Sequence, residues 1–162
     1  MNIIAIVQAR MTSTRLPGKV MKPINTDIPM IKVLLSRLSR SKDVDKIILA
    51  TSTNTADQPL AEYVSKLGYS VFLGSENDVL DRYYHAAIQY SADVVVRITG
   101  DCPLIDPDVV DAVINMYKSI DADYVSNTIT PTYPDGLDVE VFSFSSLKSA
   151  WELATTNSDR EH

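Results

Sequence analysis

Cationic and hydroxyl side chains are concentrated in one short segment near the start of the chain. Residues 8–19 read Gln-Ala-Arg-Met-Thr-Ser-Thr-Arg-Leu-Pro-Gly-Lys, with three cations, three hydroxyls and no acid. Such a loop can bind a triphosphate through side-chain charge, hydroxyl donors and backbone N–H groups. The sequence contains neither G-x-x-x-x-G-K-[ST] nor G-x-G-x-x-G, which disfavours P-loop NTPases and dinucleotide-binding oxidoreductases. The alternative is an ordinary basic loop without a ligand.

A carboxylate stands in a comparable position further along the chain. Residues 99–106 read Thr-Gly-Asp-Cys-Pro-Leu-Ile-Asp and follow an apolar run at 94–98. One carboxylate plus substrate phosphates is a common way of holding Mg²⁺, since this ion keeps several of its waters. Asp101 is therefore the candidate metal ligand, although it could merely form a turn with Gly100. Cys102 lacks a matching base and is expected to pack as a small residue rather than act as a nucleophile.

Positive charge is also concentrated in the first part of the chain. Residues 1–42 contain eight basic residues and one acid, although the whole chain has a net charge of −6. This asymmetry predicts that an anion binds near the N-terminus. Because no aromatic residue precedes Tyr63, the basic segment offers no surface on which bases could stack, which favours a small phosphorylated ligand over nucleic acid. For residues 32–42, a solvated basic face is an equally simple interpretation.

The elements that must position these groups alternate along the chain. Short apolar runs predict buried strands, and apolar residues at helical spacing predict helices between them. The alternation predicts a three-layer α/β/α sandwich around a mainly parallel mixed sheet, with ligands bound beyond the carboxyl ends of the strands. Asp106 with Pro107 is the expected start of one helix, and Ser75 with Asp78 forms an expected capping box. We predict a polar loop at 8–27, strands near 3–7, 47–50, 71–73, 94–98, 124–125 and 139–142, and helices at 30–38, 60–67, 79–88, 107–117 and 147–154.

Composition limits the class of protein. With 162 residues and 45% hydrophobic residues, the chain can form one domain with a sizeable core. A single cysteine and two histidines exclude a disulfide framework and disfavour cysteine- or histidine-ligated metal sites. No apolar run is long enough to span a membrane, and the first residues lack a signal peptide. We therefore expect a cytoplasmic protein without membrane or nucleic-acid partners.

Several of these segments together resemble a known family of enzymes. Ala9-Arg10-x-x-Ser13-x-Arg15-Leu-Pro-Gly-Lys19 and Gly100-Asp-x-Pro-Leu-Ile105 resemble the cytidylyltransferases that activate acidic sugars, the CMP-KDO and CMP-sialic acid synthetases. The resemblance is closer to the spore-coat polysaccharide biosynthesis branch and extends over essentially the whole chain. It is carried by QARM at 8–11, DVLDRYY at 78–84, GDCP at 100–103, DGLDVE at 135–140 and REH at 160–162.

This resemblance implies a reaction and a set of nucleotide-binding residues. The fold would be that of nucleotide-diphospho-sugar transferases, similar to GT-A enzymes, and CTP and Mg²⁺ would be required. An acceptor hydroxyl would attack the α-phosphate of CTP, and pyrophosphate would leave. The expected catalytic residues are Arg10, Arg15 and Lys19, which would stabilise the triphosphate and the pyrophosphate, while Asp101 would hold Mg²⁺. Backbone groups of Gln8, Ala9 and Arg10 would read the base, and Ser13 or Thr14, with Gly18 and Lys19, would complete the nucleotide site.

The acceptor site is expected on other segments. Arg82 could bind a sugar carboxylate, or it could form a solvent-exposed ion pair with Asp78, four residues earlier. Asp138 and Glu140 would share one face of a strand and could bind sugar hydroxyls. The expected acceptor-binding residues are therefore Asp78, Arg82, Asp138 and Glu140.

Two alternative functions remain open, and the resemblance also has implications for oligomeric state and chain length. A non-catalytic nucleotide- or sugar-phosphate-binding module on the same fold is the first alternative. A GT-A glycosyltransferase is the second, because such enzymes hold metal through D-x-D triplets, which occur at 106–108 and 121–123. The resemblance also implies a homodimer and a longer chain. Residues 1–162 are thus expected to be one nucleotidyltransferase domain that lacks a C-terminal portion, which predicts CTP binding with poor turnover.

Overall fold

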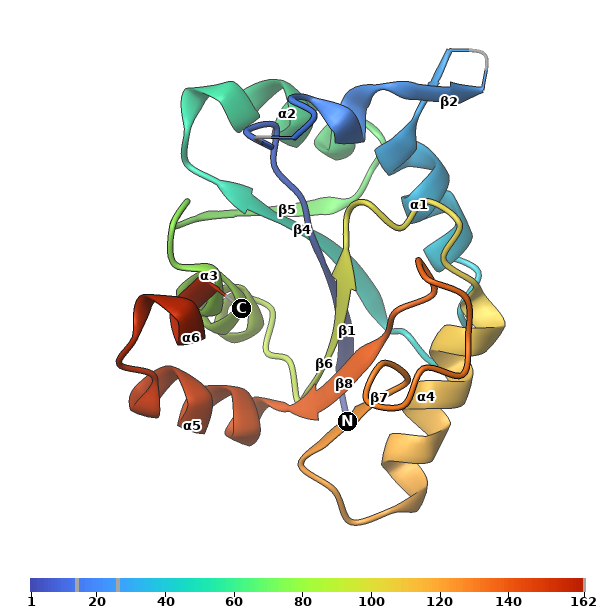
Figure 1. Cartoon of the computed structure of the whole chain (residues 1–162), viewed down its shortest axis with the longest axis vertical. Helices are drawn as coiled ribbons and strands as arrows, with labels where there is room; N and C mark the ends of the chain where they lie inside the picture. Colours follow the sequence, from blue (N-terminus) through green and yellow to red (C-terminus); the bar gives the residue numbers. More distant parts are fainter. Residues whose placement is uncertain (14, 26, 162) are drawn as a thin grey trace.

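A mixed sheet forms the centre of the molecule. The computed structural model describes residues 1–13, 15–25 and 27–161. Its six-stranded sheet has the order β5-β4-β1-β6-β8-β7 (Figure 1). Four strands are parallel, β8 runs antiparallel to β6, and β7 runs antiparallel to β8, as expected for a mainly parallel mixed sheet. The strand bounds are β1 Ile3–Gln8, β4 Lys46–Ser52, β5 Ser70–Gly74, β6 Val94–Thr99, β7 Tyr124–Ser126 and β8 Glu140–Ser143.

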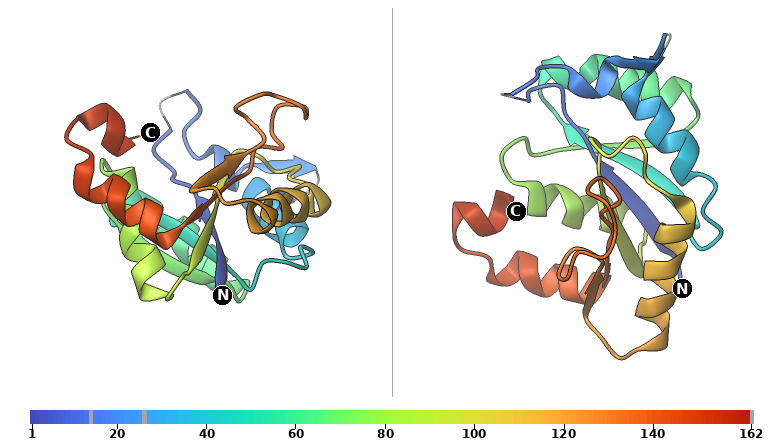
Figure 2. Two further views of the ribbon diagram at one scale, coloured as in Figure 1. Left: turned by 90° about the horizontal axis from the view of Figure 1, so that it is seen from below. Right: turned by 45° about the vertical axis from the view of Figure 1, so that its right-hand side comes forward.

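Helices cover both faces of this sheet, which confirms the predicted three layers. Figure 2 shows α1, α2 and α4 on one side and α3 and α5 on the other. The central strands are apolar on both faces because each face is covered. Ile4 and Ile6 of β1 pack towards α3, while Ala5 and Val7 pack towards α1 and α4. The helix bounds are α1 Met30–Leu38, α2 Gln58–Lys66, α3 Val79–Gln89, α4 Pro107–Ser119, α5 Phe144–Leu153 and α6 Asn157–Glu161.

Three local features differ from the sequence prediction. The segment predicted as a polar loop at 8–27 includes a 3-10 helix at Lys19–Met21 and a strand of a short hairpin, β2 Pro23–Asn25 with β3 Ile28–Pro29. The five-residue helix α6 was not expected, since it buries none of its residues and so leaves no apolar pattern. The expected capping box was wrong in its assignment: Asp78 itself is the N-cap of α3, accepting a hydrogen bond from the Asp81 N–H, whereas Ser75 Oγ accepts one from the Asp78 N–H.

The N-cap of α4 gives a prediction for stability. Asp106 Oδ1 accepts a hydrogen bond from the Asp108 N–H at 2.9 Å, and Asp106 Oδ2 lies 3.9 Å from Arg37 Nη2. Asp106→Ala should lower the free energy of unfolding by about 1 kcal/mol, measured by urea denaturation, because a helix N–H loses its acceptor. Asp106→Asn keeps the cap and loses only the charge. Equal losses in both variants would assign the effect to the ion pair instead.

The topology brings selected loops to one edge. Because β1, β4, β5 and β6 are parallel, the segments that follow them all emerge at the carboxyl edge of the sheet (Figure 1). These segments begin after Gln8, Ser52, Gly74 and Thr99. Within the part of the chain that the structure describes, no helix has the length and apolarity needed to cross a membrane.

Candidate functional site

A cationic cleft lies at the carboxyl edge, where the loops after β1 and β6 meet. It has a volume of about 290 Å³ and brings together most of the residues predicted to bind a nucleotide. The long side chains come from the loop after β1, and the acid comes from the loop after β6. We call this the nucleotide cleft; its lining is Gln8, Ala9, Arg10, Ser13, Arg15, Lys19, Val20, Thr99, Gly100 and Asp101.

The segment between Met11 and Gly18, which we call the nucleotide loop, is closed by its own backbone. The Gly18 N–H donates a hydrogen bond to the Met11 carbonyl at 2.8 Å, and Gly18 has φ +67°. This left-handed conformation is unfavourable for residues with a Cβ, so a glycine is needed at the point where the loop closes. The 3-10 helix then begins at Lys19. Thr14, one of the predicted phosphate ligands, lies outside the described residues.

Among the described residues, Asp101 is the one carboxylate that lines the nucleotide cleft, and it is paired with a cation of the cleft. Lys19 Nζ lies 3.0 Å from Asp101 Oδ2, although the two residues are far apart in sequence. Burial raises the pKa of the Asp101 carboxyl, but hydrogen bonds from Lys19 and Thr99 outweigh this effect and bring the pKa below its ordinary value. Asp101 is therefore ionised at neutral pH, in the form that binds a cation.

The donor set can be tested for its fit to Mg²⁺. Among the residues with assigned positions, no three His, Cys, Asp or Glu side chains form a metal-binding cluster. Asp101 offers one half-exposed carboxylate beside cationic groups that suit phosphate. A single carboxylate with substrate phosphates matches the preference of Mg²⁺, whereas a dedicated protein cage for metal does not fit this cleft.

A second and larger cleft lies between α3 and α5, over the face of the sheet that these two helices cover. It has a volume of about 540 Å³, and its walls are mainly aliphatic and aromatic, with Leu147, Ala150 and Leu153 contributed by α5. Its polar end is an ion pair in which Arg97 Nη1 lies 2.6 Å from Glu140 Oε1. The Tyr124 hydroxyl donates a hydrogen bond to Glu140 Oε2 at 2.9 Å. We call this the α3–α5 cleft.

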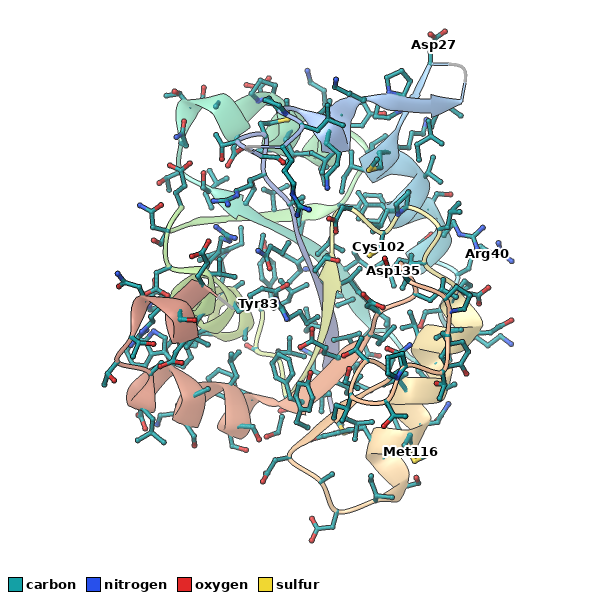
Figure 3. All side chains as sticks on the ribbon, viewed as in Figure 1. Asp27, Arg40, Tyr83, Cys102, Met116 and Asp135 are labelled. Atoms are coloured by element: carbon teal, nitrogen blue, oxygen red, sulfur yellow. The ribbon has the colours of Figure 1, made fainter. Side chains whose placement is uncertain are left out.

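The buried polar groups of the α3–α5 cleft have shifted pKa values. Burial raises the pKa of Tyr83 to about 12, so the hydroxyl stays protonated at neutral pH. Burial lowers the pKa of Arg97, but the neighbouring Tyr83 and Glu140 outweigh it and raise that pKa. Figure 3 shows Tyr83 near α3 on the side of the molecule where this cleft lies. Arg97 is thus a permanent cation at the floor of the cleft.

The predicted acceptor residues do not lie together. Glu140 lines the α3–α5 cleft, while Asp138 precedes β8 and so does not share a strand face with it. The pKa of Asp138 is raised by burial and by Asp135, Glu140 and Asp101. Figure 3 shows Asp135 close to Cys102, which places the 135–138 segment beside the loop after β6.

The expectation of an exposed ion pair between Arg82 and Asp78 was wrong. Arg82 is fully buried and donates from Nη1 to the Ser75 carbonyl at 2.6 Å. Asp78 instead lies 3.5 Å from Arg160 Nη1, which fastens α6 to the start of α3. The guanidinium of Arg82 is fully buried and therefore cannot contact an acceptor sugar in this conformation. Asp78 serves first as the N-cap of α3.

Two residues that the structure places at or beside the two clefts, Arg97 and Asp57, were not predicted from the sequence. Arg97 interrupts the apolar run 94–98, and a charge inside a buried strand could have identified it as a site residue. Asp57 has no such signal, since it is one acid in a polar segment; its role comes from contacts described below. The two D-x-D triplets do not line the nucleotide cleft, because Asp106 caps α4 and Asp123 accepts a hydrogen bond from Ser146 at 3.4 Å.

Comparison with known proteins gives this geometry a family. The sequence model of a family described as "Cytidylyltransferase" matches residues 4–162 of the chain. The chain belongs to the cytidylyltransferase family. It is 44% identical over its whole length to an uncharacterized protein of Methanocaldococcus jannaschii, and 39% identical over 76% of the chain to the spore coat polysaccharide biosynthesis protein SpsF of Bacillus subtilis. A 3-deoxy-manno-octulosonate cytidylyltransferase of Pelobacter propionicus is 38% identical over 70% of the chain.

Solved structures of cytidylyltransferases share the fold. A cytidylyltransferase from Leptospira borgpetersenii superposes with a TM-score of 0.95 at 36% identity, covering the whole of this chain and 68% of the other. A CMP:2-keto-3-deoxy-manno-octonic acid synthetase complexed with CTP has a TM-score of 0.76 at 19% identity, covering 96% and 80% of the two chains. The present cytidylyltransferase chain spans 65%, 52% and 44% of the lengths of the three curated relatives named above.

Proposed function

We propose that this protein transfers CMP from CTP to an acidic sugar, releasing pyrophosphate, in the biosynthesis of a surface polysaccharide such as a spore coat. The observation that carries the proposal is the nucleotide cleft, which Arg10, Arg15 and Lys19 line together with Asp101, the partner of Lys19. Membership of the cytidylyltransferase family supports CTP as the nucleotide. The names of the SpsF and 3-deoxy-manno-octulosonate relatives support the sugar acceptor and the pathway.

The residues of the nucleotide cleft suit nucleotidyl transfer because that reaction needs charge neutralisation and alignment rather than covalent catalysis. Arg10, Arg15 and Lys19 bind the triphosphate and stabilise the charge on the departing pyrophosphate. Backbone groups of Gln8 and Ala9 read the base, and Ser13 binds phosphate. Asp101 holds Mg²⁺, which when bound polarises the phosphate oxygens and helps to orient them. An acceptor hydroxyl attacks the α-phosphate in line with the leaving pyrophosphate.

The α3–α5 cleft is the proposed acceptor site because β6 connects it to the nucleotide cleft. Arg97 lines the first and Thr99 lines the second, and side chains two residues apart on a strand point to the same face about 7 Å apart. A sugar in the α3–α5 cleft can therefore present a hydroxyl at the boundary between the two clefts. A sugar carboxylate would compete with Glu140 for Arg97, and sugar hydroxyls would compete with Arg97 and Tyr124 for Glu140.

Nucleotide preference tests the first part of the proposal. CTP with Mg²⁺ should raise the melting temperature of the protein more than ATP or GTP with Mg²⁺, because base recognition adds to phosphate binding. The measurement is a thermal shift at matched nucleotide and metal concentrations. Equal shifts for the three nucleotides would count against a cytidylyltransferase, and no shift would exclude a nucleotide site.

Pyrophosphate release over a panel of sugar acids tests the second part. Release that requires both CTP and one sugar acid establishes the transfer and identifies the acceptor. CTP binding without release for any sugar acid would favour a non-catalytic nucleotide-binding module. The homodimer and the cytoplasmic location predicted from the sequence belong to the same proposal; sedimentation and cell fractionation test them.

A further inference from the structure

A buried acid outside the nucleotide cleft is bonded to the start of the nucleotide loop. Asp57 ends a 3-10 helix that follows β4, and its side chain is fully buried. Asp57 Oδ1 accepts a hydrogen bond from the Met11 N–H at 2.6 Å. Asp57 Oδ2 accepts hydrogen bonds from the Ser52 N–H at 3.3 Å and from the Ser52 hydroxyl. Both carboxylate oxygens are therefore used to join the loop after β1 to the end of β4.

The nucleotide loop closes at the backbone of Met11. Its N–H is bonded to Asp57, and its carbonyl accepts the hydrogen bond from the Gly18 N–H. Met11 and Gly18 separate the loop that carries Ser13 and Arg15 from the rest of the chain. Asp57 thus holds the backbone at the point where the loop begins and closes.

A second acid holds the neighbouring residue of the loop. Glu76, in the segment after β5, accepts a hydrogen bond from the Thr12 hydroxyl at 3.2 Å through Oε1. Its Oε2 accepts one from Asn54 Nδ2 at 2.8 Å. Three segments that follow β1, β4 and β5 are therefore tied together by Asp57 and Glu76. Neither acid lines the nucleotide cleft.

The charges of Arg82 and Arg10 also act on this cluster. Arg82 is fully buried, and within the described residues its Nε and Nη2 have no hydrogen-bond partner. Burial lowers the pKa of Arg82 and the positive charge of Arg10 lowers it further, whereas Tyr83 and, less strongly, Asp57 and Glu76 act in the opposite direction. A buried cation without a compensating charge is costly. Asp57 and Glu76 therefore supply negative charge that partly compensates the positive charges of Arg82 and Arg10.

We propose that Asp57 and Glu76 are positioning residues that hold the nucleotide loop in the conformation that binds the β- and γ-phosphates. The proposal rests on the proposed function for its ligand and on the contacts above for its geometry. Asp57→Asn keeps the acceptor for Met11, but its amide group faces the N–H and hydroxyl of Ser52 and the negative charge is lost. Since hydrogen bonds to charged groups are the stronger ones, CTP affinity should fall about tenfold.

The test compares Asp57→Asn with Asp111→Asn. Asp111 of α4 anchors a turn in the same manner, accepting hydrogen bonds from the Ser41 hydroxyl and the N–H groups of Lys42 and Asp43, but this turn precedes β4 at the opposite edge of the sheet. Calorimetry gives the affinities of CTP and CMP for each variant. The ratio of CTP to CMP affinity should fall about tenfold in Asp57→Asn, whereas Asp111→Asn should lower the melting temperature and leave the ratio unchanged.

Hydrogen exchange separates this proposal from the proposed function. Amides of residues 9–20 should exchange faster in Asp57→Asn than in the wild type, and those of residues 41–43 faster in Asp111→Asn. This readout needs no ligand, so it holds even if CTP is not the nucleotide. If Asp57→Asn is unstable, the more accessible Glu76→Gln should give the same changes to a smaller extent. The proposal would be overturned if Asp57→Asn and Glu76→Gln both left the ratio of CTP to CMP affinity and the amide exchange of residues 9–20 unchanged.

Discussion

Gly100→Ala is expected to destabilise the protein by about 3 kcal/mol and to lower kcat/KM on the order of 100-fold. A Cβ at this position would lie 2.6 Å from Ala9 Cβ and 2.8 Å from the Gln8 carbonyl oxygen. The Gly100 N–H also donates to that carbonyl at 2.7 Å, so the loops after β1 and β6 are in direct backbone contact here. Backbone cannot rotate away as a flexible side chain can, and the two loops must separate. Lys19 and Asp101 then lose their spacing.

Gly68→Ala is the matched control because it makes the same chemical change without a collision. Gly68 follows α2 with φ +92°, and a Cβ there would have no neighbour within 4 Å. We expect a loss of about 1 kcal/mol from the left-handed conformation and unchanged CTP binding. Urea denaturation and calorimetry measure both quantities. If Gly100→Ala bound CTP within threefold of the wild type, close contact of the two loops would not be required for the site.

The strands and the meeting of the two loops could be predicted because both follow from the apolar pattern. The run 3–7 is apolar throughout and the run 94–98 is apolar except for Arg97, which indicates strands buried on both faces of a parallel sheet. Once β1 and β6 are parallel, the segments after them must emerge at one edge, so Arg10 and Asp101 come together without further information. The family resemblance added CTP and Mg²⁺, which neither spacing nor composition specifies.

Other parts of the site depended on contacts that no local pattern encodes. Arg82 reads as a surface residue of an amphipathic helix, but it lies on the buried face of α3 against Gly74, where only a glycine leaves room for its side chain. Asp57 has its proposed positioning role only because the fold brings its carboxylate within hydrogen-bond distance of the Met11 N–H. The α3–α5 cleft required α5 to lie across from α3, a placement set by the antiparallel strands β7 and β8 rather than by either helix.

Asp101→Asn should change CTP affinity in opposite directions with and without metal. In the wild type Asp101 is paired with Lys19 at 3.0 Å and adds a negative charge to a cleft proposed for phosphates. Removing that charge frees Lys19, so in the presence of EDTA the affinity for CTP should rise about fivefold, the effect of unit charges about 4 Å apart in water. With Mg²⁺ the variant loses the proposed metal ligand. The gain in CTP affinity that Mg²⁺ provides should disappear, and turnover should fall on the order of 100- to 1,000-fold.

Lys19→Met distinguishes this role from a purely structural one. It removes the same ion pair from the other side, and CTP affinity should fall both in EDTA and in Mg²⁺, since a phosphate-binding cation is lost. If Asp101 served only to orient Lys19, Asp101→Asn would lower CTP affinity under both conditions, as Lys19→Met does. Titration calorimetry of the two variants with CTP, in EDTA and in Mg²⁺, therefore gives the sign that decides between a metal ligand and a loop contact.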